Sequence, residues 1–310
     1  MTPVAAARSH VQRLIFDLVA GPKGPATRDR IRGTPGPRWF EPGSPIRRVH
    51  GDASMYVGGI RALLLQSLHP LAMAAVDDHS GYKGDPWGRL ARTSAFLATT
   101  TFGTAADAQQ AIDIVRAVHR HITGTTPDGR PYRADDPHLL RWVHVAEIDS
   151  FLSAHQRYGA VPLTPAEADE YVAQASRVAL GLGAVDVPTT TAELAAAIKA
   201  YRPELTSTAA AREAARFILV RPPVPALIRA PYAVLAAAAI GLLPNWSRAP
   251  LRVPYLPITE GTVVRLAGST AVRSLRWVMS ATPVLDADDP DDDADAGQVV
   301  SAATAGPSRG

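Results

Sequence analysis

The chain has 310 residues, which is enough for one large domain or two ordinary ones with room for a small-molecule pocket. Its 46% hydrophobic and 20% charged residues are typical of a globular protein and exclude a disordered or fibrous one. The net charge is only +3 and the basic residues form no stripe or tail, so no nucleic-acid partner is expected.

The sequence contains no cysteine. This excludes disulfides, zinc ribbons, iron–sulfur clusters, a thiol nucleophile, and thiolate-ligated or covalently attached haem. Any metal or haem must therefore be held by His, Asp, Glu or Tyr.

The first predicted element is an amphipathic helix over residues 4–20, in which charged side chains interrupt every apolar run before it reaches signal-peptide length. The most apolar stretch, residues 232–243, is far shorter than the roughly 20 residues of a spanning helix. We therefore expect no stable membrane insertion and a cytoplasmic location.

The remaining chain is predicted to be mostly helical, since no period-2 runs joined by hairpin turns stand out. Threonines 104, 164 and 190, each with an acidic residue three positions on, are typical of helix starts, as is the pair Asp136-Pro137. Further helices are predicted over residues 52–76, 86–100, 104–123, 137–158, 164–182, 190–201, 207–220, 225–243 and 260–280. Residues 21–48, 124–136, 221–225 and 244–258 are expected to be connectors.

We divide the chain into a helix and linker over residues 1–34, one helical domain over 35–283, and an acidic tail over 284–310. The tail has too little apolar surface to offset the entropy of ordering, so we expect it to be disordered.

His69-Pro70 lies inside the apolar helix predicted for residues 52–76. The proline removes a backbone donor, so the helix should kink or end near His69. Such a kink can open a pocket or be only structural.

The helix from residue 86 carries Arg89, Arg92 and Thr93 on one face, at spacings of three and four residues. Two guanidinium groups and a hydroxyl could hold a carboxylate or a bound oxygen species. A solvated basic face is the alternative.

Helical projection of residues 104–123 places His119 on the apolar stripe with Ala108 and Ile112, and places His121 off it. His119 is therefore either a hydrogen-bonded core residue or a ligand. In the helix from Asp136, His144 and Glu147 share an inward face, as a possible metal pair or a hydrogen-bonded pair.

Four segments occur in an order that resembles the mpaB/rubber-oxygenase catalytic family, long described as a domain of unknown function. They are HPLAMAAVDDHS, DPWGRLARTSAFLATTTFG, RAVHRHITG and YRADDPHLLRWVHVAEIDS, and they contain the motifs Arg-x-x-x-Thr, His-x-x-Ile-x-Gly and Tyr-x-x-x-Asp-Pro-x-Leu-Leu-x-Trp. The resemblance covers roughly residues 35 to 280.

The resemblance implies an all-α, globin-like helical core that binds haem b and uses O₂ on hydrophobic substrates. Rubber oxygenases cleave polyisoprene, and a fungal member cleaves a prenyl side chain in mycophenolic acid biosynthesis. By motif, the iron ligand falls on His119, and the residues near the haem fall on Arg89 and Thr93.

The sequence departs from the rubber oxygenases at two points. Arg92 stands where they have a lysine, and residues 53–76 contain no acidic side chain where they have a catalytic glutamate. Because arginine is a poor proton donor, His69 or His144 is the candidate for proton transfer.

The preferred interpretation is a haem b oxygenase that acts on an unsaturated or terpenoid-like small molecule, and it leaves room for a redox partner. One alternative is a non-haem metal oxygenase with His69, His119, His144 and Glu147 as ligands. A second is a domain that binds haem or a small molecule without catalysis.

Overall fold

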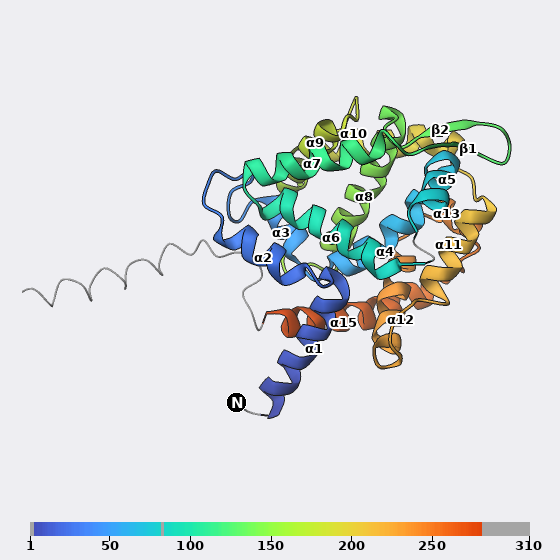
Figure 1. The fold of residues 1–310 in the computed structure, drawn as a ribbon. Coiled ribbons are helices and arrows are strands. Elements are labelled where there is room, and N and C mark those ends of the chain that lie inside the picture. Colours follow the sequence, from blue (N-terminus) through green and yellow to red (C-terminus); the bar gives the residue numbers. More distant parts are fainter. Residues whose placement is uncertain (1–2, 82–83, 281–310) are drawn as a thin grey trace, which may run out of the picture.

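The computed structural model describes residues 3–81 and 84–280, and the predicted acidic tail lies outside these ranges (Figure 1). Helices dominate the described residues, and the two strands in them have three residues each. The all-α prediction is confirmed. The helices are α1 (Pro3–Ala20), α2 (Gly24–Gly33), α3 (Pro45–Gly51), α4 (Met55–Gln66), α5 (Pro70–His79), α6 (Pro86–Phe102), α7 (Ala105–His119), α8 (Pro137–Tyr158), α9 (Pro165–Leu182), α10 (Thr191–Tyr201), η1 (Arg202–Glu204), α11 (Ala209–Leu219), α12 (Ala226–Gly241), α13 (Asn245–Leu251), α14 (Pro257–Thr259), η2 (Glu260–Val264) and α15 (Arg265–Met279).

The predicted helix starts are present because side chains satisfy the first free backbone amides. The hydroxyls of Thr104, Thr164 and Thr190 each accept a hydrogen bond from the amide three residues on. Asp136 accepts from the amides of His138 and Leu139, with Pro137 at the first helical position. These caps fix where α7, α8, α9 and α10 begin.

The predicted helix over residues 52–76 is two helices. α4 ends at Gln66, α5 begins at Pro70, and their axes differ by 107°. His69 has extended backbone angles between them, as expected for a residue that precedes proline. The prediction of a break near His69 is confirmed, and the prediction of one continuous helix over residues 52–76 is wrong.

Three predicted connectors contain regular structure. α2 and α3 lie within or beside the Pro/Gly-rich segment 21–48, and α13 lies within 244–258. Strands β1 (Thr123–Thr125) and β2 (Pro131–Arg133) pair antiparallel in the segment expected to be a loop. Residues 122–125 take part in this pairing, so α7 ends at His119, earlier than the predicted end at residue 123.

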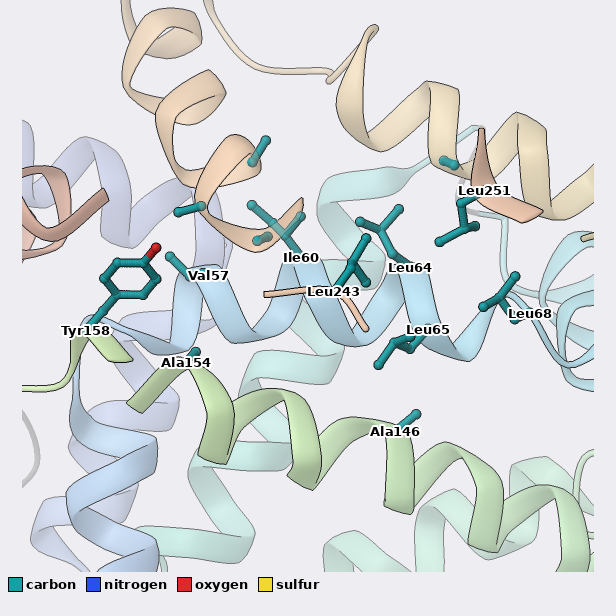
Figure 2. Close-up of a cluster of buried hydrophobic side chains, with 14 of the residues drawn as sticks. Val57, Ile60, Leu64, Leu65, Leu68, Ala146, Ala154, Tyr158, Leu243 and Leu251 are labelled. Atoms are coloured by element: carbon teal, nitrogen blue, oxygen red, sulfur yellow. The ribbon is translucent and has the colours of Figure 1, made fainter. Parts of the chain in front are cut away.

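α4 and α8 make the most extensive helix contact in the described structure. Figure 2 shows Leu65 on the side of α4 that faces α8, while Leu64 lies toward the later segment that carries Leu243 and Leu251. α4 is therefore packed on two sides. Gly58 permits its close approach to α8, since an added Cβ would lie 2.9 Å from Phe151 Cδ1.

A second apolar cluster joins α8 to α3, α9 and α10, with Val49, Ile148, Tyr171 and Leu194 buried in it. α8 thus contributes to both clusters. No single helix in the described part of the chain is long and apolar enough to cross a membrane, although the bent pair α4 and α5 passes that test together by length and composition.

Candidate functional site

A largely apolar cavity of about 410 Å³ lies among helices α3 to α9 and α11. This volume is in the range of small-molecule sites. Its apolar wall includes Leu63, Met73, Val76, Leu90, Phe96, Leu97, Leu140, Phe151, Phe217 and Ile218. Polar side chains from several helices interrupt this wall.

His119 is the last residue of α7 and lines the cavity. Its Nδ1 is buried and makes no hydrogen bond. Burial lowers the pKa of His119, and the charge of Asp135 opposes this only in part. The imidazole is therefore neutral near pH 7, which is the form that binds a metal. The inward direction expected from helical projection is confirmed.

The three α6 residues singled out in the sequence are not brought together at the cavity. Arg89 lines it, whereas Thr93 is exposed and its Oγ1 donates a hydrogen bond to the Arg89 carbonyl at 3.1 Å. Arg92 is also exposed, with Nη1 3.6 Å from Asp85 Oδ2. Only Arg89 of the three can meet a molecule in the cavity in this conformation.

His144 and Glu147, one turn apart on α8, both line the cavity. His144 is buried, its Nε2 makes no hydrogen bond, and burial lowers its pKa to about 4. Burial raises the pKa of Glu147 to about 7. The cavity therefore holds a neutral imidazole and a carboxyl group that changes charge near neutral pH.

His50, at the end of α3, is a cavity residue that the sequence prediction missed. Its Nδ1 lies 2.8 Å from Thr101 Oγ1, and its Nε2 lies 3.4 Å from Tyr171 Oη. Burial lowers its pKa to about 3. With both ring nitrogens partnered, His50 is a structural element of the wall. The pair Ser44-Pro45 before α3 is a helix-start signal that could have revealed this helix.

His69 does not line this cavity, although it is buried. It faces His138 and Glu204. The sequence set His69, His119, His144 and Glu147 is therefore divided between two places, with the last three on the cavity wall.

Residues 47–281 match the sequence model of one known family, which is described as "ER-bound oxygenase mpaB/B'/Rubber oxygenase, catalytic domain". No curated protein and no solved structure gives a match. The globin-like arrangement of the core and the domain boundaries consequently stay predictions. Because the match extends over most of the chain and includes the whole cavity except Ile46, we conclude that this protein belongs to the mpaB/rubber-oxygenase catalytic-domain family, which indicates an oxidoreductase of the oxygenase type.

Proposed function

We propose that the protein is a haem b-dependent oxygenase that acts on a hydrophobic small molecule, with His119 as the iron ligand. One observation carries the proposal: two buried imidazole nitrogens without hydrogen-bond partners, His119 Nδ1 and His144 Nε2, belong to side chains on the wall of one apolar cavity. Buried polar atoms without partners are rare in proteins and call for an explanation, such as an absent ligand.

The residues present are compatible with a haem. An apolar wall suits the porphyrin face, a neutral histidine is a usual ligand of haem iron, and the Arg89 guanidinium is suited to pair with a propionate. When bound, the haem would supply the iron at which O₂ is activated. Thr93 is exposed and bonded to its own helix, so we give it no role in holding the group.

The chain's own contribution is to bind, orient and exclude water. His119 would fix the position of the iron from the end of α7, while the side chains of α4, α5 and α11 would surround an apolar substrate. A largely apolar wall favours unsaturated hydrocarbon or terpenoid-like molecules over polar ones.

Glu147 is the candidate for proton transfer at the cavity. Rubber oxygenases have a catalytic glutamate on an earlier helix, where this chain has no acidic residue between positions 53 and 76. Glu147 brings a carboxyl group to the cavity from α8, and its pKa of about 7 lets it donate or accept a proton near neutral pH. His144, with a pKa of about 4, is neutral near pH 7, so it could accept a proton at that pH but not act as an acid.

The test is the absorption spectrum and extracted haem content of protein expressed with a haem supply. We expect a Soret band in the wild type that is lost or strongly shifted in His119→Ala. His121→Ala is the matched control, because His121 is an exposed histidine only two residues away. Equal haem content in both variants, or no haem after reconstitution of the wild type, would contradict the proposal.

A second test addresses Glu147. With the haem content unchanged, Glu147→Gln should lower O₂-dependent turnover of a hydrophobic substrate by a factor of about 10² to 10⁴. Unchanged turnover would remove Glu147 from the reaction without affecting the assignment of His119.

A second candidate is a non-haem metal oxygenase, and the observation that favours it is the shared position of His119, His144 and Glu147 on the cavity wall. Two imidazoles and one carboxylate are a donor set used by non-haem iron oxygenases. Stoichiometric iron without a Soret band, lost in Glu147→Gln and His144→Ala, would favour this candidate over haem.

A further inference from the structure

A second group of ligand-type side chains lies outside the cavity. His69, His138 and Glu204 each offer one donor atom, and the three atoms lie within 4.8 Å of one another. The residues come from three separate segments: the turn between α4 and α5, the first turn of α8, and η1. Only the tertiary structure brings them together.

His69 is the most buried of the three, at 3% exposure, yet neither of its ring nitrogens makes a hydrogen bond. Its Nε2 lies 3.5 Å from Glu204 Oε2. Buried polar groups without hydrogen bonds are destabilising, and an ion bound at Nε2 would give this nitrogen a partner closer than the 3.5 Å contact with Glu204.

The carboxylate of Glu204 lies between the two histidines. Its Oε2 is 2.8 Å from His138 Nε2 and 3.5 Å from His69 Nε2. Ligand atoms bound about 2.1 Å from a tetrahedral ion lie about 3.4 Å from each other, so small side-chain movements would place all three around one cation.

Neighbouring contacts hold these side chains in place. The Tyr201 hydroxyl donates a hydrogen bond to the His138 carbonyl at 2.8 Å and lies 3.4 Å from His138 Nδ1. A proton on Nδ1 directed at this oxygen leaves Nε2 free as a ligand, which is the usual arrangement at metal-binding histidines. The Thr206 amide also donates to the Leu68 carbonyl at 2.8 Å, which ties the chain after η1 to the residue before His69.

We propose that His69, His138 and Glu204 bind one divalent transition-metal ion of the Zn²⁺ class. Two imidazoles and one carboxylate suit such an ion, whereas Ca²⁺ and Mg²⁺ prefer sites made of oxygen ligands. The ion links the α4–α5 turn, α8 and η1, and three protein ligands leave a coordination position open to water. This site is separate from the cavity of the proposed oxygenase and does not depend on that function.

The experiment is zinc titration of the EDTA-treated, tag-free full chain by calorimetry, with bound zinc measured after equilibrium dialysis. We expect one zinc ion per wild-type chain, and at least tenfold weaker binding in His138→Ala and in Glu204→Gln. Both side chains are about half exposed, at 50% and 44%, so these variants should fold, and circular dichroism will check this.

Two histidine variants serve as controls. His121→Ala removes an exposed histidine outside both sites, and His119→Ala removes one from the cavity. Both should keep the zinc ion. No stoichiometric zinc in the wild type, undiminished binding in both His138→Ala and Glu204→Gln, or loss of zinc only in His119→Ala would overturn the proposal. None of these outcomes bears on the Soret band that tests the oxygenase.

Discussion

Glu147 is a carboxyl group in a largely apolar wall, and its environment determines its chemistry. Removal of water penalises the charged form, which raises its pKa from 4.5 to about 7. The same wall lowers the pKa of His144, one turn earlier, to about 4. Burial thus keeps both groups neutral at mildly acidic pH, and only Glu147 becomes charged as the pH rises through 7.

This pKa predicts a pH dependence of stability. A carboxyl group whose pKa is raised by folding does not lower the free energy of unfolding below pH 4.5. It destabilises the folded state increasingly as the pH rises toward about 7. In the protein without cofactor, Glu147→Gln should therefore be about 3 kcal/mol more stable relative to wild type at pH 8 than at pH 4.

Urea denaturation of both proteins at these two pH values will measure the difference. A constant difference in the free energy of unfolding across this range would show that Glu147 has an ordinary pKa. Glu193→Gln is the comparison variant, and its difference should have the opposite sign, because Glu193 is an exposed carboxylate whose pKa is lowered by hydrogen bonds from Thr189.

At the residue scale, periodicity predicted the inward directions of His119, His144 and Glu147, because a regular helix fixes the direction of each side chain relative to the apolar stripe. The same reasoning grouped Thr93 with Arg89, yet only Arg89 reaches the cavity. Residues on one helical face share a direction, but the neighbouring helices decide how much of that face is covered.

At the scale of elements, the contact between α4 and α8 depends on Gly58. A Cβ there would lie 2.9 Å from Phe151 Cδ1 and 3.1 Å from its Cα, so the two helices would have to separate. The adjacent Gly59, on the same helix, has nothing within 4 Å of an added Cβ. Substitution of each glycine in turn therefore distinguishes the effect of helix packing from the effect of helix propensity.

We predict opposite effects of the same substitution at these positions. Gly58→Ala should destabilise the protein by about 1–3 kcal/mol through overpacking. Gly59→Ala should stabilise it by about 0.5–1 kcal/mol, since alanine loses less backbone entropy in a helix. Thermal denaturation of both variants will check this, and a loss of stability of equal size in both would contradict the role of Gly58.

Helices that begin with a capping residue could be predicted from the sequence, whereas the two paired strands could not. Asp136-Pro137 and the three threonine caps define their helices locally. Strands β1 and β2 have three residues each, too few for an alternating pattern, and they exist because residues 123–125 and 131–133 pair with each other.

At the scale of the whole molecule, Arg61 connects three helical segments in the interior. Its Nη1 lies 2.7 Å from Asp149 Oδ2 and donates to Ser150 Oγ at 2.7 Å, and its Nε donates to the Leu242 carbonyl at 2.9 Å. The Arg61 side chain is only 4% exposed. It therefore compensates the charge of Asp149, whose side chain is only 23% exposed.

Removal of this arginine should be costly. Arg61→Ala leaves a partly buried carboxylate without its partner, for which we expect a loss of about 3–5 kcal/mol. The double variant Arg61→Ala/Asp149→Ala should recover part of that loss. Chemical denaturation will measure both, with Arg116→Ala as the exposed control, expected within about 0.5 kcal/mol of wild type. A double variant no more stable than Arg61→Ala would show that the carboxylate is not the cause.

The sequence by itself determined the all-α class, the cavity-facing side of α7 and α8, the break at His69-Pro70 and the family, because each depends on local spacing or on motifs in order. The tertiary structure alone decided which of these residues meet. It separated His69 from His144 and placed it beside His138 and Glu204, which are distant in the chain. Burial, and with it the pKa of Glu147, is likewise a property of the packed molecule, since the cavity wall around it is built by helices from separate parts of the chain between residues 46 and 218.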